Sequence, residues 1–288
     1  MRRYHTPTMK ILVTGGSGRV GWHVVQELAK AHEVVIFGRR RPEEGPHKAK
    51  SAFPFVKGDL LDTAVIAKAL QGVQAVAHLG ANPWFSPTTF LVNTVGTYNM
   101  LEGCREAGIK RFVVAGSDWG AGKSADRMEP PRVVPMTEAD PVYPHDHYGL
   151  SKNVNEVTCE MYGREYGMKT AVLRLTGVWM PEATDGYAAK GHKGAEASCA
   201  QYWWTYVDVR DVARAFRMAI EYPGLPASGA YFIAASDTVI DIPTMQAIRK
   251  HMPKVKVRKT IPGFGTTLSL AAAKKAFGWA PIHSWRKG

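Results

Sequence analysis

Three residues of types that carry out proton transfer stand in a suggestive spacing. Tyr148 and Lys152 form a Y-x-x-x-K pair, and Ser117 stands upstream at the end of an apolar run. Residues four apart on a helix lie on one face, one turn apart. A phenol is a poor base at neutral pH, but a neighbouring ammonium favours the phenolate and lowers its pKa. We therefore predict that Tyr148 exchanges a proton with a substrate hydroxyl or carbonyl while Ser117 bonds the same oxygen.

On its own, the Y-x-x-x-K pair fits two ordinary residues of a helix surface better than a catalytic pair. A glycine-rich turn near the start of the chain supplies the missing context. The apolar run 11–13 predicts a buried strand, a helical pattern begins at Trp22, and Gly15, Gly18 and Gly21 stand between them. Strand, glycine turn and helix in this order are typical of dinucleotide-binding domains, whose helix N-terminus holds a pyrophosphate. The simpler alternative is a plain tight turn.

The end of the second predicted strand indicates which dinucleotide binds. Residues 33–37 form an apolar run that ends at Gly38 and Arg39. A domain specific for NAD usually carries Asp or Glu here for the ribose 2′-hydroxyl. A guanidinium instead binds a 2′-phosphate through charge-assisted hydrogen bonds. We therefore favour NADP(H) over NAD(H), which stays possible, with Arg19 as a second phosphate ligand; the alternative is a solvated basic loop.

The combined pattern resembles the extended short-chain dehydrogenases/reductases, the NAD(P)-dependent epimerase/dehydratase-like enzymes, and among them the small uronate dehydrogenases. The resemblance rests on G-x-x-G-x-x-G after Thr14, on N-x-x-G-T at 93–97, on the Ser-Tyr-Lys set and on the closing segment 271–281. It implies an α/β fold, a doubly wound parallel Rossmann sheet with a small C-terminal substrate-binding lobe. We expect a disordered leader at 1–8, a Rossmann domain at 9–175 that is joined again by 205–222, and a lobe formed by 176–204 and 223–288.

The motifs and the resemblance together assign a set of site residues. The cofactor candidates are Gly15, Ser17, Gly18, Arg19, Val20, Gly38, Arg39, Asp59, Leu60, Leu79, Gly80, Ala81, Lys152 and Leu175. The substrate candidates are Asn82, Trp84, Trp119, His147, Thr176, Trp179 and Trp203. The aromatic residues among them are as often simply part of a core. The alternative for Asp59 is that Asp59 or Asp62 caps the helix that follows, at 63–70.

Departures from the family pattern narrow the reaction. Gly177 stands where enzymes of nucleotide-linked sugars usually carry Asn, and the stretch from Pro181 to Trp204 is short. No Glu follows Asp118, as the sugar-nucleotide dehydratases require. We therefore predict hydride transfer with a small carbonyl or alcohol, such as a sugar or sugar acid. An epimerase that uses the cofactor transiently and a non-catalytic dinucleotide-binding regulator are the alternatives.

Composition limits the partners and the compartment. The formal charge is +12, but the basic residues are scattered and no nucleic-acid-binding motif occurs, so we expect no nucleic-acid partner. No apolar run reaches the roughly 18 residues of a membrane span. Three widely separated cysteines fit a reducing cytoplasm and form no metal site. The resemblance also implies a homodimer.

Overall fold

The computed structural model describes residues 7–83, 85–123, 129–182 and 196–287, and within them a seven-stranded parallel sheet forms the centre. The strand order is β10-β7-β5-β4-β1-β2-β3. These strands are β1 (Lys10–Thr14), β2 (Glu33–Gly38), β3 (Phe55–Lys57), β4 (Ala75–His78), β5 (Arg111–Ser117), β7 (Lys169–Leu175) and β10 (Ala230–Ile233).

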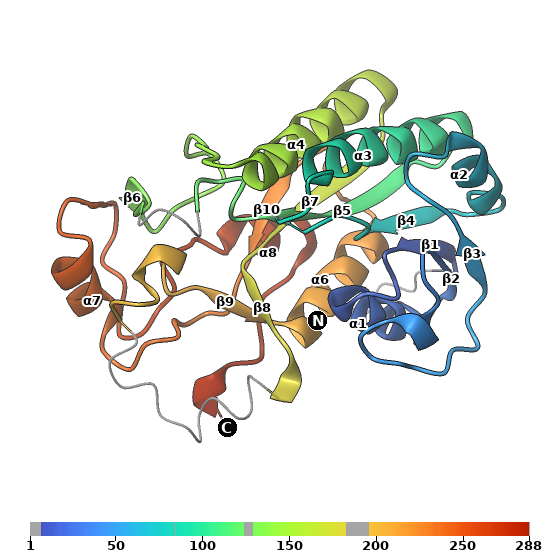
Figure 1. Cartoon of the computed structure of the whole chain (residues 1–288). Coiled ribbons are helices and arrows are strands. Elements are labelled where there is room, and N and C mark those ends of the chain that lie inside the picture. Colours follow the sequence, from blue (N-terminus) through green and yellow to red (C-terminus); the bar gives the residue numbers. More distant parts are fainter. Residues whose placement is uncertain (1–6, 84, 124–128, 183–195, 288) are drawn as a thin grey trace.

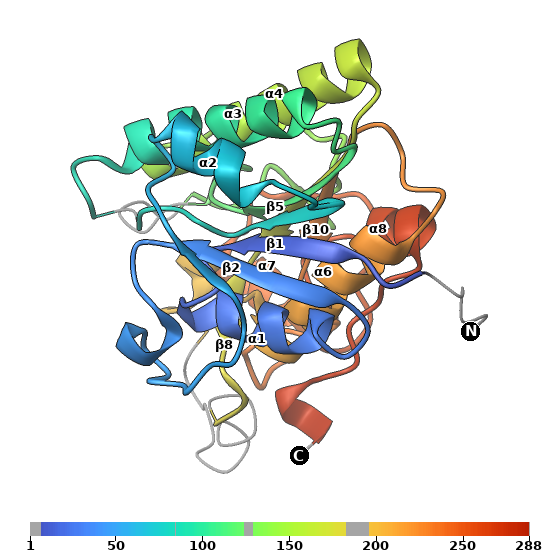
Figure 2. The same cartoon turned by 90° about the vertical axis from the view of Figure 1, so that its right-hand side faces the viewer.

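Helices cover both faces of this sheet (Figures 1 and 2). One face carries α2 (Thr63–Ala69), α3 (Thr89–Glu106) and α4 (His147–Tyr166), and the other carries α1 (Arg19–Leu28), α6 (Val209–Glu221) and α8 (Ala271–Phe277). Side chains of a strand alternate between the two faces. Ile11 and Val13 of β1 accordingly pack in the core on the α1 and α6 side, and Leu12 packs in the core beneath α2 and α3. Burial on both faces explains why the strand is a continuous apolar run.

The path of the chain reverses next to β1. The strands β2 and β3 lie on one side of β1, and β4 returns to its other side. In open parallel sheets, ligands bind outside the carboxyl ends of the strands at such a switch point. The fold therefore predicts a site beside the residues that follow β1 and β4.

A smaller lobe with its own core lies beside the sheet (Figure 1). It contains the strand pairs β6–β11 and β8–β9 and the helix α7. Of three short 3-10 helices, η2 and η3 contribute residues to the core of this lobe, and η1 follows β2. Their bounds are β6 (Val133–Val134), β8 (Gly177–Trp179), β9 (Tyr206–Asp208), α7 (Thr244–His251), β11 (Lys256–Val257), η1 (Pro42–Glu44), η2 (Ala200–Tyr202) and η3 (Trp285–Lys287). Its core includes the fully buried side chains of Trp204 and Ile240.

One sequence-based boundary is corrected by the topology. The prediction assigned 223–288 to the lobe, but β10 within this range pairs with β7 and forms the edge strand of the central sheet. The run from Ala230 to Ile233 is apolar enough for a buried strand, and only tertiary pairing decides which sheet it joins. The proposed leader, 1–8, falls mostly outside the described residues. Among the described helices, none is long and apolar enough to cross a membrane.

Candidate active site

The glycine turn after β1 is shaped by close backbone contacts. Gly15 has a φ of +68°, and a Cβ there would lie 2.8 Å from the backbone nitrogen of Gly80. A Cβ on Gly21 would overlap the carbonyl oxygen of Gly15. The helix α1 starts with Gly18 as its N-cap, with no capping side chain and no acidic residue in its first turn. This arrangement fits a pyrophosphate, because amides at a helix N-terminus point at the space where an anion binds.

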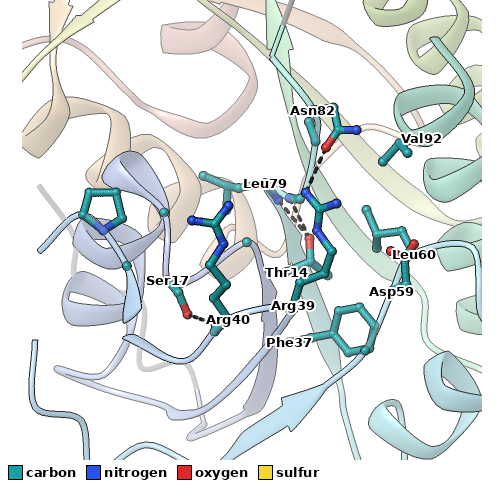
Figure 3. A pocket seen from close by; sticks show the side chains of 18 residues that line it. Thr14, Ser17, Phe37, Arg39, Arg40, Asp59, Leu60, Leu79, Asn82 and Val92 are labelled. Atoms are coloured by element: carbon teal, nitrogen blue, oxygen red, sulfur yellow. Dashed lines mark hydrogen bonds between the residues drawn. The ribbon is translucent and has the colours of Figure 1, made fainter. Parts of the chain in front are cut away.

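A cavity of about 300 Å³ lies against this turn (Figure 3). It is lined by residues that follow four strands of the sheet: Thr14, Gly15, Ser17, Gly18, Gly38, Arg39, Arg40, Gly58, Asp59, Leu60, Leu79, Gly80, Ala81 and Asn82. The Arg39 side chain extends across the cavity, where its guanidinium donates a 3.0 Å hydrogen bond to Asn82 Oδ1. Nearby, Ser17 Oγ donates to the carbonyl of Arg40 at 2.8 Å. A cationic side chain therefore lies inside the cavity at the position predicted from the second strand.

Asp59 and Leu60 form one wall of this cavity. The carboxylate of Asp59 accepts from the Leu61 amide at 3.0 Å, whereas Asp62 is the residue that caps α2 by accepting from Val65. Asp59 therefore lies beside the cavity in a tight turn, and Asp62 is the residue that caps the helix.

A buried histidine supports the opposite wall. His78 Nδ1 lies 2.9 Å from Thr14 Oγ1 and its Nε2 lies 3.2 Å from Thr97 Oγ1. Since Thr97 donates to the Asn93 carbonyl and Thr14 accepts from the amides of Leu79 and Gly80, we assign the proton to Nε2. Burial, followed by the charge of Lys152, lowers the pKa of His78 to about 3, so this histidine is neutral.

A second cavity, of about 520 Å³, contains the three predicted catalytic residues. Ser117, Tyr148 and Lys152 line it together with Arg19, Val20, Leu175 and Thr176. It shares Gly15, Gly18, Leu79, Ala81 and Asn82 with the first cavity. The two cavities therefore have a common wall of backbone, so a dinucleotide held by the glycine turn would reach Tyr148 at one end.

Burial shifts the pKa values of both Tyr148 and Lys152. Lys152 is buried, donates to the Ala115 carbonyl at 2.9 Å, and has its Nζ 5.6 Å from the Tyr148 ring centroid. Burial lowers the pKa of Lys152 to about 8. Burial also raises the pKa of Tyr148 to about 12, with Asp118 and Asp146 raising it further and a hydrogen bond with Ser117 lowering it. Burial is the largest influence on the pKa of Tyr148. The lowering expected from Lys152 together with an oxidised nicotinamide stays a prediction.

Hydrogen bonds fix the helix that carries Tyr148. Asn93 accepts from the Asn82 amide at 2.8 Å and donates to the Asn82 carbonyl at 3.2 Å and to Ser151 Oγ at 3.1 Å. Ser151 in turn donates to the carbonyl of Tyr148 at 2.7 Å. At the start of α4, Asp146 accepts from the Gly149 amide at 2.6 Å. The loop after β4 and the catalytic helix are therefore held in one fixed relation.

Several substrate candidates meet at the second cavity. Asn82, Trp119 and Thr176 line it, and the Trp119 and Tyr148 rings meet edge to face with centroids 5.7 Å apart. An aromatic wall beside the tyrosine suits the apolar face of a small organic substrate.

Other substrate candidates lie elsewhere. His147 is exposed at the first position of α4, and Trp179 packs on Tyr206 at 4.5 Å between centroids. Trp203 is buried, donates its indole N–H to the Glu129 carbonyl, and lines a separate cavity of about 110 Å³. Trp84 lies outside the described residues.

Some residues that line the cavities were missed by the motifs. Arg40, Gly45 and Pro46 line the first cavity, and Asp118 lines the second. Gly45 reaches the site because its segment folds back over the glycine turn, where a Cβ would overlap the Ser17 carbonyl. Loop packing of this kind leaves no periodic signal in the sequence. Asp118 follows Ser117 in the chain, but only the lining of the second cavity shows that it belongs to the site.

Comparison with known proteins agrees with this geometry. Residues 11–234 match the model of the NAD dependent epimerase/dehydratase family. The chain belongs to this family. The match spans the glycine turn, the Ser-Tyr-Lys set and the whole central sheet except part of its first strand, which confirms the resemblance seen in the motifs.

Members of the family with different activities are similar to this chain. An L-arabinose 1-dehydrogenase (NAD(P)(+)) of Haloferax volcanii is 28% identical over 253 residues, 83% of this chain and 94% of that protein. A uronate dehydrogenase of Pseudomonas putida is 27% identical over 178 residues, 59% of this chain and 61% of that protein. A putative UDP-glucose 4-epimerase of Methanocaldococcus jannaschii is 31% identical over 179 residues, 59% of this chain and only 56% of that protein.

A solved structure confirms the fold class. A short-chain dehydrogenase/reductase superfamily protein from Agrobacterium tumefaciens, crystallised with bound NAD, has a TM-score of 0.72 and 22% identity. The superposition covers 96% of this chain and 94% of that protein. The likeness establishes the Rossmann-like α/β architecture that the sequence predicted.

Proposed function

We propose that this protein is an NADP(H)-dependent oxidoreductase that transfers hydride between the nicotinamide and a small carbonyl or alcohol substrate. The observation that carries the proposal is the meeting of Ser117, Tyr148 and Lys152 in a cavity whose wall continues into the glycine-turn cavity. Neither a pure dinucleotide-binding regulator nor a structural protein needs a phenol and an ammonium in that place.

The protein's own residues would handle the proton and the substrate oxygen. Ser117 Oγ bonds and orients the oxygen, and Tyr148 gives it a proton or takes one from it. The bound nicotinamide supplies or accepts the hydride. Lys152 and Tyr148 lie on one face of α4, so the ammonium sits beside the ring of the residue that ionises.

Arg39 supports the choice of NADP(H). Its guanidinium already lies in the cavity that would hold the adenosine, bonded to the neutral acceptor Asn82. A 2′-phosphate is a far stronger acceptor than an amide oxygen. Arg40 lines the same cavity. Gly38 and Arg39 stand at the end of β2, where an NAD-specific domain places a carboxylate.

The substrate we propose is a small sugar, sugar acid or related alcohol that carries no nucleotide. The relatives that act on such molecules include the L-arabinose and uronate dehydrogenases. The short stretch between β8 and β9 supports the same conclusion, because a second nucleotide would need additional chain to bind it.

The direct test offers the enzyme a panel of pentoses, hexoses and uronates with NADP⁺ or NAD⁺. The absorbance of the reduced nicotinamide measures the reaction. Wild type is expected to turn over a member of this panel. Tyr148→Phe is expected to lose roughly 100- to 10,000-fold in kcat, since the proton-transfer group is gone. Cofactor affinity of the variant should stay within about twofold. Full turnover by Tyr148→Phe would contradict the mechanism.

An epimerase is the second candidate, favoured by the similarity to a putative UDP-glucose 4-epimerase. Such an enzyme oxidises and re-reduces its substrate without net change of the cofactor. Conversion of a sugar or nucleotide-linked sugar into its epimer, with no accumulation of reduced nicotinamide, would favour this alternative.

We also propose a homodimer in the cytoplasm. Apolar side chains stand exposed along α3 and α4, namely Phe90, Leu91, Val95, Tyr98, Leu150 and Val157. These two helices pack side by side on one face of the sheet (Figure 1). Large apolar side chains that stand exposed on two adjacent helices favour a protein interface there. Three free cysteines suit a reducing compartment.

A further inference from the structure

A buried ion pair includes the residue that follows Ser117 in the chain. Lys123 Nζ is 2.5 Å from Asp118 Oδ2, and each side chain is 2% exposed. Asp118 follows Ser117 at the end of β5 and lines the cavity that contains Tyr148. The mechanism above uses neither of the two charges.

The pair closes a compact turn that carries Ser117 and Trp119. The amide of Asp118 donates to the Leu175 carbonyl at 3.0 Å, and the amide of Gly120 donates to the Ser117 carbonyl at 3.1 Å. The Lys123 amide donates to the Asp118 carbonyl at 3.3 Å. The chain thus folds back after β5, which brings the ammonium of Lys123 onto the carboxylate five residues earlier.

The same ammonium ties this turn to a distant segment. Lys123 Nζ donates to Thr205 Oγ1 at 2.9 Å, and Thr205 immediately precedes β9. Thr205 Oγ1 in turn donates to the Tyr202 carbonyl at 3.1 Å. The rings of Tyr202 and Trp203 lie 6.0 and 5.9 Å from Nζ. Carboxylate, hydroxyl and aromatic rings therefore surround the ammonium, which has no water-exposed side.

We infer that Lys123 is a positioning residue of the reaction: its bonds to Asp118 and Thr205 hold the Ser117–Trp119 turn against the segment before β9, so that Ser117 Oγ stays in place opposite Tyr148. The inference rests on the proposed function, since it assigns Ser117 a role toward the substrate oxygen. It concerns the substrate end of the site, because Asp118 lines the second cavity and not the first.

Stability alone does not account for such a pair. Two buried charges lose their hydration, and well-packed apolar residues of similar volume often stabilise a fold as well or better. An ion pair with a third hydrogen-bonded partner instead permits one geometry. Displacement of a catalytic group by about 1 Å can lower a rate by roughly 100-fold. Rigid placement of Ser117 is therefore the effect that this arrangement adds.

The experiment compares Lys123→Met with wild type and with Lys275→Met, a matched change on the exposed side of α8. Circular dichroism first establishes that each variant is folded. Lys123→Met is expected to lose roughly 10- to 100-fold in kcat on a substrate identified with wild type. The cofactor Kd, measured by fluorescence titration, should stay within about twofold, and Lys275→Met should match wild type throughout.

Hydrogen exchange tests the same inference without a substrate. Amides of residues 118–123 should exchange faster in Lys123→Met, while those of the glycine turn 15–18 keep the wild-type rate. Should Lys123→Met not fold, Thr205→Val takes its place, since it removes only the hydroxyl that anchors the ammonium. It is expected to lose about three- to tenfold in kcat with the same local change in exchange.

The outcomes separate this inference from the proposed function. A folded variant with wild-type kcat, or with unchanged exchange at 118–123, overturns the positioning role while the function stands. Equal losses in kcat and in cofactor affinity also overturn it, because the effect would then be a general disturbance. If wild type turns over no substrate but local exchange rises in the variant, the proposed function fails. Lys123 then holds the turn in place without serving this reaction.

Discussion

At the scale of single residues, the proposed cofactor choice depends on Arg39, whose guanidinium donates to the neutral Asn82 oxygen. Arg39→Ala should weaken NADPH binding by roughly 10- to 100-fold, the value of one hydrogen-bonded charge, and leave NADH binding within about twofold. Calorimetric titration of both cofactors checks this. Lys57→Ala, at the exposed end of β3, is the control. Equal affinity of wild type for the two cofactors would contradict the NADP(H) preference.

His78 gives a pH dependence whose sign follows from its burial. Its pKa is lowered from 6.5 to about 3 in the folded protein, so the unfolded chain binds the extra proton first as the pH falls. Stability contributed by neutral His78 is therefore present above about pH 6.5 and is lost on acidification. Between about pH 7.5 and pH 5.5 this amounts to about 1.4 kcal/mol.

Urea unfolding at these two pH values checks the prediction with His78→Asn, which has no titrating ring. The variant should lose about 1.4 kcal/mol less than wild type over the interval, whatever its absolute stability. His145→Asn serves as the control because that histidine is exposed. An identical fall in wild type and His78→Asn would show that other groups govern the acid transition.

At the scale of elements, the junction of β1 and α1 depends on the absence of a side chain at Gly21. A methyl group there would overlap the Gly15 carbonyl and move the helix away from the strand. Gly21→Ala should therefore cost about 1–3 kcal/mol of stability through overpacking and raise the cofactor Kd at least about tenfold. Thermal unfolding and cofactor titration measure the two effects.

Gly108→Ala serves as a comparison, because it adds backbone strain without a steric overlap. Unlike the helical Gly21, Gly108 has a left-handed φ of +71°, and no atom lies within 4 Å of an added Cβ. The change should cost about 1–2 kcal/mol of backbone strain and leave the cofactor Kd unchanged. A similar loss of cofactor affinity in both variants would mean that close packing at Gly21 is not what shapes the pyrophosphate site.

At the scale of the whole molecule, the exposed apolar side chains of α3 and α4 predict self-association. Val157 is 61% exposed on α4, and a glutamate there would place an unpaired charge inside the proposed interface. Val157→Glu should convert a dimer into a monomer in light scattering, since burying that charge costs several kcal/mol. Ile282→Glu, which is 54% exposed near the C-terminus, should remain dimeric. A monomeric wild type would refute the prediction directly.

Much of this protein follows from local patterns in its sequence. Continuous apolar runs identified the strands of the sheet, because a strand that is buried on both faces has no polar side. Tyr148 and Lys152 lie on one helix, α4, as their spacing predicted. The glycine turn and the Ser-Tyr-Lys set could be read because close backbone approach and proton transfer each demand particular residue types.

Only the tertiary structure decided what depends on contacts between distant segments. The pairing of β10 with β7 shows that this strand, within the range assigned to the lobe, belongs to the central sheet. Trp203 turned out to lie in the core away from the catalytic cavity, since burial depends on what packs around a residue and not on its type. The raised pKa of Tyr148 comes from desolvation, and the Asp118–Lys123 pair comes from the turn after β5; both exist only once the chain has folded.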